Sequence, residues 1–411
     1  MVFQHNIRSV GYHDLDDRPA FKFAMQECNG RLYLYVAHLW EACISVLDVT
    51  DPERPVLKHR VDGPPNTWSH QIQIADGRMI VNYEHRIAGW GLDPNGPPPQ
   101  EGLLVYDVQE PTLPKLLGKW EGGGNGTHRN FYTGGRYVHA TASRRGFRGK
   151  HYVILDIEDP RRPQEVGAWW VPGQKEGEEL PEKYRNKLVD LHGPPYVVGN
   201  RVYCPWSSAG LIILDISNPS APQKVSQLDV NPPLGSRIAL HTVVPARDPR
   251  FLIVNSEALR ERCDEPVNFA GIVDISNELE PRLISLFPTP EIPEGYPHRD
   301  FVDKGGRFGP HNQHHYHGNA ALLPQDDYVY LTYFNAGLQV YDISNPRFPR
   351  IAGYYIPDDP VKRLGPLPLD LVVQYEDVMV DRRGYAYVSE KNSGLHILQF
   401  APHANRESPR G

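Results

Sequence analysis

One phrase recurs along the chain and limits its fold more than any other feature. Its copies are LDVTDPERP, YDVQEPTLP, LDIEDPRRP, LDISNPSAP, VDISNELEP and YDISNPRFP. The repeated aspartates are Asp48, Asp107, Asp156, Asp215, Asp274 and Asp342, at intervals of 59, 49, 59, 59 and 68 residues. A degraded seventh copy, SGLHILQF, places Gln399 at the aspartate position. Self-similarity at such a period indicates a repeat architecture built from one structural unit.

Each repeat has the same internal pattern. An alternating strand leads to a turn rich in Gly, Asn or Asp, as in YTGGRYVH and VVGNRVYC, and a second strand follows. A third strand ends in the repeated phrase, and a fourth follows its proline-rich turn, as in PQKVSQLDV. Four antiparallel strands per unit, repeated around an axis, predict an all-β fold, a seven-bladed β-propeller formed by residues 1–411 as a single domain.

The two ends of the sequence also fit this arrangement. The seventh repeat stops after its third strand, GLHILQF, whereas the N-terminal segment QHNIRSVGYHDL has the pattern of a fourth strand. We therefore expect the N-terminal strand to complete the last blade and to remove an open sheet edge.

The phrases GLIILDISNPSAP and GLQVYDISNPRFP resemble the LVIVD-repeat β-propellers, and the resemblance extends over almost the whole chain. A weaker likeness, in organisation only, is to the selenium-binding/methanethiol-oxidase propellers, which look like copper-dependent oxidases. The LVIVD resemblance implies an architecture and says little about chemistry, because one fold hosts many functions. Function must therefore be inferred from a site.

Charge and composition exclude several classes of partner. The net charge is −7, and Lys and Arg are scattered, so we expect neither a nucleic-acid nor a membrane partner. The N-terminus lacks the apolar segment of a signal peptide, which predicts a cytoplasmic location. The four cysteines lack CxxC spacing and are expected to be reduced. A small-molecule substrate is the expected partner, and the oligomeric state stays open.

Five consecutive repeats carry a histidine at one structural position, near the start of the first strand. In each repeat it lies eight to ten residues before the first residue after the turn that joins the first two strands. These histidines are His70, His128, His192, His241 and His317, and the seventh repeat has Glu376 there. Innermost propeller strands surround the central channel, so the imidazoles should form an inward-facing ring. Neutral imidazoles suit transition metals, with Fe or Cu favoured and Mn, Ni or Zn as alternatives. The alternative to metal binding is a set of hydrogen-bonded channel histidines.

The segment HNQHHYH, residues 311–317, leaves the sixth ligand ambiguous. His317 aligns best with the other histidines, and His315 points to the same face of a strand because side chains alternate. We expect one of these two residues to be a metal ligand.

The second strand of each repeat returns to the same end of the channel. It is expected to bring candidate catalytic side chains close to the metal, where carboxylates can also orient ligand histidines. These side chains are Glu84, His85 and Glu257, together with Glu376 from the innermost strand. Insertions at this end should form a substrate pocket, whose candidate residues are Arg129, Arg260, Trp68, Trp206, Tyr316 and Phe334.

The sequence therefore favours a metal-dependent enzyme. A histidine-rich centre suits a redox metal, so we expect an oxidoreductase or oxygenase that acts on a small aromatic or carboxylated molecule. One alternative is a hydrolase or lyase that uses the metal as a Lewis acid. A second alternative is a non-catalytic interaction propeller. GxSxG, Walker, dinucleotide-binding and HExxH motifs do not occur in the sequence.

Overall fold

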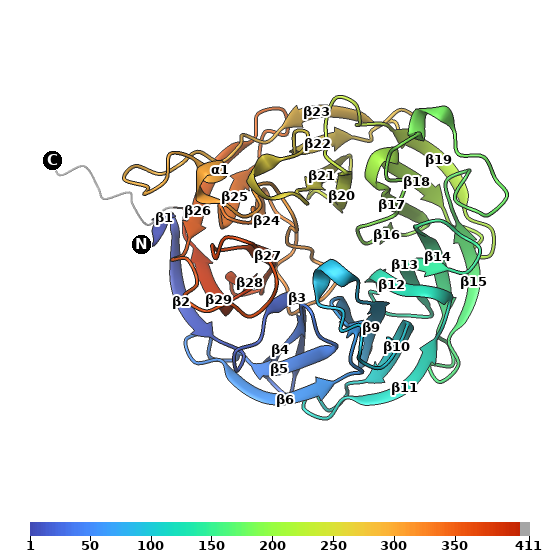
Figure 1. Cartoon of the computed structure of the whole chain (residues 1–411), viewed down its shortest axis with the longest axis horizontal. Coiled ribbons are helices and arrows are strands. Elements are labelled where there is room, and N and C mark those ends of the chain that lie inside the picture. The colour runs from blue at the N-terminus through green and yellow to red at the C-terminus, as the bar shows by residue number, and fades with distance from the viewer. Residues whose placement is uncertain (403–411) are drawn as a thin grey trace.

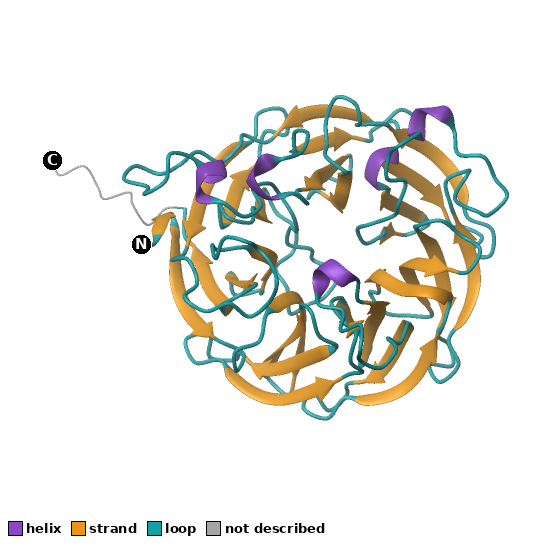
Figure 2. Cartoon of the chain, in the orientation of Figure 1, coloured by secondary structure: helices purple, strands orange, loops and turns teal. Residues whose placement is uncertain are grey.

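The computed structural model describes residues 1–402, and these residues form antiparallel sheets arranged in a ring (Figure 1). Strands dominate the structure, and the helical segments are short (Figure 2). The helices are α1 (Phe301–Lys304) and the 3-10 turns η1 (Ala88–Trp90), η2 (Glu182–Tyr184), η3 (Ser207–Ala209) and η4 (Glu261–Cys263). Among residues 1–402, no helix combines the length and the apolar character needed to cross a membrane.

Five of the sheets have four strands each. In chain order, their strands are β3 (Ala20–Cys28), β4 (Arg31–His38), β5 (Cys43–Asp48) and β6 (Val56–Asp62); β16 (Tyr196–Val198), β17 (Arg201–Pro205), β18 (Leu211–Asp215) and β19 (Gln223–Leu228); β20 (Ile238–Pro245), β21 (Phe251–Glu257), β22 (Ala270–Asp274) and β23 (Arg282–Leu286); β24 (Tyr328–Thr332), β25 (Leu338–Asp342), β26 (Arg350–Ile356) and β1 (Phe3–His5); and β27 (Tyr375–Val380), β28 (Tyr385–Glu390), β29 (Gly394–Phe400) and β2 (Ile7–His13).

A further sheet contains nine strands. They are β7 (Thr67–Trp68), β8 (Ile72–Ala75), β9 (Arg78–His85), β10 (Gly102–Asp107), β11 (Lys115–Trp120), β12 (Gly123–Phe131), β13 (Tyr137–Arg144), β14 (Lys150–Asp156) and β15 (Gln164–Trp169). Within it, β8 to β11 and β12 to β15 are two four-stranded antiparallel units joined where β9 pairs with β12.

The N-terminal strands join the sheets that lie last in the sequence. β2 pairs with β29 from Ile7 opposite Phe400 to His13 opposite Leu395. β1 pairs with β26, a contact that the sequence did not predict. The N-terminal segment thus bridges two neighbouring sheets on the outside of the ring (Figure 1).

The hydrophobic core lies between the faces of neighbouring sheets. Tyr35 and Val46 of the β3–β6 sheet pack with Ile72, Val81 and Leu104 of the next sheet in one buried cluster. Such packing requires strands that are apolar on both faces, and the third strands are buried along nearly their whole length. The core therefore holds the sheets around the axis and leaves the inner strand ends free to carry polar side chains.

The repeated aspartate has a structural role. At the end of each third strand, its carboxylate accepts a hydrogen bond from the backbone N–H two residues further on. The donors are the N–H groups of Thr50, Gln109, Glu158, Ser217, Ser276 and Ser344. The side chain thereby fixes the turn into the fourth strand, as Asx turns do. The phrase that identifies the fold does not contribute to a site.

Candidate metal centre

Five histidines from neighbouring repeats lie side by side around the channel axis. The centroid distances are 4.8 Å from His70 to His128, 4.4 Å from His128 to His192, 5.5 Å from His192 to His241 and 4.9 Å from His241 to His311. We call these five residues the histidine ring. Phe21 fills the remaining position, 5.7 Å from His70 and 6.0 Å from His311.

Irregularities in the inner strands place these side chains. In β12, Thr127 pairs with Ala142 and Arg129 with Thr141, so His128 is an extra residue in a β-bulge. A bulge changes the side of the sheet to which adjacent side chains point, and both His128 and Arg129 line the same cavity. The local backbone therefore overrides strict alternation at this end of the strand.

Two other inner strands have similar irregularities at the same end. In β20, the pairing shifts between Ile238 and Thr242, next to His241. In β27, it shifts between Tyr375 and Val378, where Glu376 lies. Bulges thus accompany the site residues in several sheets.

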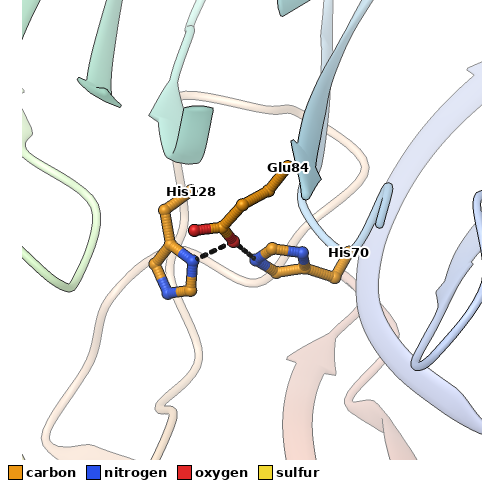
Figure 3. A group of neighbouring side chains, drawn as sticks. All are labelled: His70, Glu84 and His128. Carbon is orange, nitrogen blue, oxygen red and sulfur yellow. Dashed lines mark hydrogen bonds and ion pairs between the residues drawn. The ribbon is translucent and has the colours of Figure 1, made fainter. Parts of the chain in front are cut away.

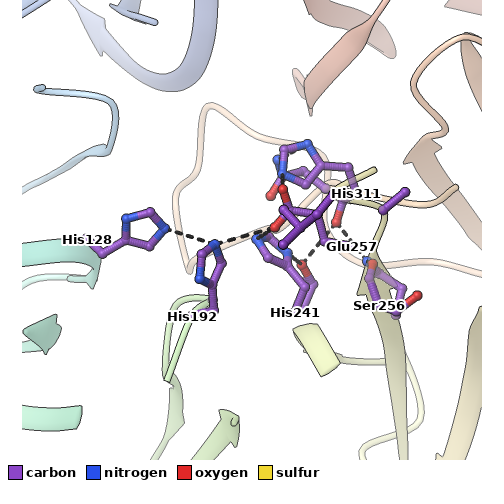
Figure 4. Close-up of polar contacts among 12 residues, drawn as sticks. His128, His192, His241, Ser256, Glu257 and His311 are labelled. Atoms are coloured by element: carbon purple, nitrogen blue, oxygen red, sulfur yellow. Dashed lines mark hydrogen bonds and ion pairs between the residues drawn. The ribbon is translucent and has the colours of Figure 1, made fainter. Parts of the chain in front are cut away.

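Glu257, at the end of β21, lies among three members of the ring (Figure 4). Its Oε2 atom is 3.4 Å from Nε2 of His192 and 3.5 Å from Nε2 of His241, and its Oε1 atom is 3.6 Å from Nε2 of His311. These separations are longer than ordinary hydrogen bonds. Oε2 of Glu257 and the Nε2 atoms of His241 and His311 are buried without hydrogen-bond partners among residues 1–402.

The partners of the opposite ring nitrogens fix the tautomers of two of these histidines. Nδ1 of His311 has two neighbours, Oε2 of Glu376 at 2.8 Å and the amide nitrogen of Asn312 at 3.1 Å, and the closer, charged carboxylate is the stronger partner, so we assign the proton to Nδ1. Nδ1 of His241 is 2.7 Å from Oγ1 of Thr242, which itself donates to the carbonyl of His311. Both Nε2 atoms are therefore bare acceptors that face Glu257.

Glu84, at the end of β9, forms a different arrangement with the other half of the ring (Figure 3). Its Oε2 atom accepts a 2.6 Å hydrogen bond from Nδ1 of His128 and is 3.7 Å from Nε2 of His70. The side-chain amide of Asn82 lies 3.3 Å from Nδ1 of His70 and also donates to the carbonyl of Thr127. The proton of His70 is then on Nε2, which makes this nitrogen a donor.

Two groups of side chains have the composition and spacing of metal ligands. One contains His70, Glu84 and His128, and the other contains His192, His241 and Glu257; within each group the ligand atoms lie within 4.8 Å of one another. The groups adjoin where Nε2 of His128 is 3.2 Å from Nε2 of His192. The second group offers the bare Nε2 of His241 and a carboxylate oxygen without a partner among residues 1–402, and it fits a metal better.

Burial favours the neutral form of three ring imidazoles. It lowers the pKa values of His70, His128 and His241 well below the usual range, and nearby cations or histidines add to the effect. Burial also raises the pKa of Glu84 to about 7. Neutral imidazole is the form that binds a metal.

Glu376 is held ionised beside His311. Burial alone would raise its pKa, but the Lys391 ammonium, 2.5 Å from Oε1, together with His311 and Arg307 outweighs burial and holds the pKa well below its usual range. A carboxylate that accepts the Nδ1–H of a histidine fixes the orientation of that ring. Glu376 is thus placed to orient His311.

The histidine ring opens into a cavity of about 410 Å³, which we call the ring cavity. Its volume lies in the range of small-molecule sites. Of the residues predicted for catalysis and substrate binding, Glu84, His85, Glu257, Glu376, Arg129 and Trp68 line it.

The remaining predicted pocket residues lie elsewhere. Arg260 is exposed and pairs with Asp264, and Trp206 is buried in a core cluster, where it packs on Trp169. Tyr316 packs against another core cluster. Phe334 stacks on the ring of His311, with 4.8 Å between the ring centroids, so it packs against a histidine of the site. Only Arg260 lies in one of the predicted insertions, and core packing decided the orientation of the three aromatic residues.

His317 and His315 are not part of the histidine ring, which corrects the predicted register in this repeat. His311 takes the position instead, since its N–H donates to the carbonyl of Thr332 in β24. The inner segment and β24 are joined by residues 315–327, a longer connection than the other tight turns, and His317 lies in it with a left-handed φ of 54°. The alignment of the repeats counted back from the start of β24, and it therefore selected His317, which belongs to this connection.

His315 and His317 line a separate small cavity of about 30 Å³ farther along the inner strands, which we call the distal cavity. Its other polar residues include Lys22, Gln73 and Asp377. Lys22 and Asp377 form a buried ion pair of 2.7 Å there.

Sequence reasoning missed the roles of Phe21, His311 and Arg307 in the site. His311 was within the histidine-rich segment, so a search for the segment's pairing partner in β24 could have found it. Arg307 approaches from an insertion, and its position carried no sequence signal.

The comparisons with known proteins concern the repeats. Residues 32–63, 196–230 and 325–356 match the family model of the LVIVD repeat. These segments cover most of three of the four-stranded sheets. A search of curated proteins gives no significant match.

Two solved structures are similar to the chain as a whole. One is the computationally designed Ika8 protein, with 10% sequence identity, a TM-score of 0.48, and coverage of 95% of this chain and 98% of the other. The second is a functionally unknown protein from Desulfotomaculum acetoxidans DSM 771, with 13% identity, a TM-score of 0.47, and coverage of 78% and 81%. The chain thus contains LVIVD repeats in three of its sheets, which confirms its resemblance to the LVIVD-repeat β-propellers.

Proposed function

We propose that the chain is a seven-bladed β-propeller and that β2 closes its ring. The count follows if β8 to β11 and β12 to β15 are taken as separate blades beside the five four-stranded sheets. Removal of residues 1–13 would expose the edges of β26 and β29, so we expect a lower melting temperature. An unchanged melting temperature would contradict closure by this segment.

We further propose that the chain is a metal-dependent oxidoreductase that acts on a small molecule in the ring cavity. The observation that carries this proposal is the cluster of partnerless acceptor atoms on Glu257, His241 and His311. A buried acceptor without a partner is costly, and three in one place call for a cation. Transition metals, with Fe or Cu favoured and Mn, Ni or Zn as alternatives, suit these ligands.

The spacing of the ligand atoms supports the same location. Two atoms bound tetrahedrally to one ion at about 2.1 Å would be about 3.4 Å apart. The distances from Glu257 to the Nε2 atoms of His192 and His241 are 3.4 and 3.5 Å. His192, His241, His311 and Glu257 are therefore the proposed ligands, and His128 adjoins them through Nε2.

The protein's own groups would keep this ligand set in place. Glu376 and Thr242 hold the Nδ1 protons of His311 and His241, so their Nε2 atoms stay bare. On the other side of the cavity, Glu84 orients His128 by a hydrogen bond. A redox metal bound here would supply electron transfer to or from the substrate or a small oxidant.

Lewis-acid chemistry is the second candidate function, because the same ligands could also hold a hydrolytic metal. Oxygen consumption during turnover would favour the oxidoreductase over a hydrolase or lyase. The cytoplasmic location and the absence of nucleic-acid partners stay predictions from the sequence.

The decisive experiment is elemental analysis of the purified protein and of two variants. We expect wild-type protein to contain a transition metal and His241→Ala to lose it. The matched control is His139→Ala, which removes a buried histidine that hydrogen-bonds to Tyr152 outside the ring. This control should be less stable but should keep its metal. Wild-type protein that stays metal-free after reconstitution would overturn the proposal and favour an interaction propeller.

A further inference from the structure

We propose that Arg129 binds the carboxylate of a small apolar or aromatic substrate in the ring cavity. This inference rests on the proposed function, because it takes the cavity as the place where the substrate binds. It goes further by naming the chemical class of the substrate and the group that recognises it.

Arg129 is a buried cation with open hydrogen-bonding positions. The bulge in β12 places it beside His128 in the cavity wall, and only 2% of its surface is exposed. Its guanidinium lies over the ring of Phe21 at 5.3 Å. Its Nε and Nη1 atoms have no hydrogen-bond partner among residues 1–402.

The other buried cations in or near the cavity are paired, and Arg237, which also lines it, is exposed to solvent. Lys150 is 2.9 Å from Asp190, Arg307 is 3.3 Å from Glu257, Lys391 is 2.5 Å from Glu376 and Lys22 is 2.7 Å from Asp377. Within residues 1–402, Arg129 has no acidic group at ion-pair distance. An unpaired buried charge is strongly unfavourable, so this one exception points to an anion that the protein does not itself supply.

The unpartnered atoms of the cavity wall are of two kinds. Acceptors gather on Glu257, His241 and His311, where the metal is proposed. Donors remain on Arg129, on Nη2 of Arg307, on Nε1 of Trp68 and on Nε2 of His70. A carboxylate has only acceptors, and it matches the planar guanidinium of arginine.

The rest of the wall suits an apolar body on the same ligand. Trp68 packs edge-on against Trp90 at 5.4 Å, and Leu39, Leu188 and Ile238 also line the cavity. Aromatic and aliphatic walls with few polar groups bind apolar ligands and orient them through those groups. The geometry therefore points to a monocarboxylate with an aromatic or branched aliphatic body.

The test compares benzoate with benzamide, which has the same shape but no charge, by isothermal titration calorimetry. Wild-type protein should bind benzoate at least ~10-fold more tightly than benzamide, since charge-assisted hydrogen bonds are the strong ones. Arg129→Gln should remove most of this preference, and Arg129→Lys should keep part of it because the charge remains. The matched control is Arg260→Gln, an exposed arginine outside the cavity, which should bind benzoate like the wild type.

A second titration uses protein treated with a chelator, because benzoate could also bind a metal directly. Binding that persists without metal and disappears in Arg129→Gln supports the inference. Binding that is lost on metal removal but survives in Arg129→Gln overturns it, as does equal affinity for benzoate and benzamide or no binding of benzoate. Elemental analysis of the same samples is independent of these titrations, so metal-free wild-type protein would contradict the proposed function alone. If Arg129→Gln does not fold, the comparison of benzoate and benzamide affinities on wild-type protein still tests the inference.

Discussion

The ring cavity and the distal cavity both gather histidines, yet only one of them has the chemistry of a metal site. Among residues 1–402, His315, in the distal cavity, has two ring nitrogens without partners, and three ring histidines, His70, His241 and His311, have an unpartnered Nε2. The ring cavity adds four carboxylates, Glu84, Asp190, Glu257 and Glu376, and Glu257 keeps an oxygen without a partner among residues 1–402, whereas the carboxylate of the distal cavity, Asp377, is bound by Lys22. Within residues 1–402, both groups with metal-ligand spacing lie at the histidine ring.

The difference shows that imidazoles alone do not make a site. A second strand that ends in an acidic residue brings Glu84 and Glu257 to one end of the channel. The distal cavity lies farther along the inner strands, beyond the reach of these residues. The following predictions test this contrast, and the largest expected effect comes first.

The largest effect on metal affinity should come from replacing each of the two candidate ligands of the sixth repeat in turn. His311→Ala removes a bare nitrogen next to Glu257, so the affinity for the metal should fall by more than about 100-fold. His317→Ala should leave the affinity unchanged. Metal titration of both variants measures this, and the reverse result would restore His317 as the ligand.

Two adjacent acidic residues of β27 offer a finer comparison. Glu376→Gln weakens the hydrogen bond that orients His311, and we expect metal affinity to fall by about 10-fold. Asp377→Asn leaves Lys22 without its buried partner, so it should lower the free energy of unfolding and leave metal affinity unchanged. Equal loss of metal in both variants would contradict the separation of the two cavities.

His314, which packs beside the distal cavity, should make stability depend on pH. It accepts from the N–H of Val380 through Nδ1 and lies 2.8 Å from the carbonyl of Leu323 through Nε2, so the folded protein needs it neutral. Burial lowers its pKa from 6.5 to about 4. The unfolded chain therefore binds the proton first, and stability present above pH 6.5 is lost as the pH falls toward 4.

The expected slope for this histidine is about 1.4 kcal/mol per pH unit. Urea unfolding of metal-free protein at several pH values measures it, and His314→Gln should flatten the dependence. A variant with the same slope as the wild type would show that other groups control acid unfolding.

The smallest effect is expected at His315. Its ring is 7% exposed and both nitrogens lack partners, so the folded protein gains little from its polarity. His315→Leu should leave stability unchanged or raise it by about 1 kcal/mol. The control His38→Leu removes a histidine with hydrogen bonds to Pro19 and Ser45, and it should be destabilising. Chemical denaturation compares the two, and a large loss in His315→Leu would reveal an unrecognised partner in the distal cavity.

Part of the candidate site could be predicted from the sequence. His70, His128, His192 and His241 occur at similar distances from turns of similar length, and the structure brings all four together. Glu84 and Glu257 were predicted from their places at the ends of second strands, and each contacts ring histidines. Their metal-binding role stays a prediction.

The sequence by itself determined the all-β repeat architecture, because its signals are local. Strand alternation, the first turn and the aspartate that fixes the second turn all act within a few residues, as the Asp215 to Ser217 hydrogen bond illustrates. Each copy contains the same local interactions, so the order of strands could be inferred without knowledge of the packing.

Only the tertiary structure decided which side chains meet at the axis. A bulge turned Arg129 into the same cavity as His128, and a long connection carried His317 away while His311 took its place. The tautomers, the ion pairs and the unpaired guanidinium of Arg129 depend on neighbours that are far apart in sequence, as Glu257 and His311 are. At the inner strand ends, the direction of each side chain and its polar partners depend on contacts between sheets. These contacts exist only once the ring has formed.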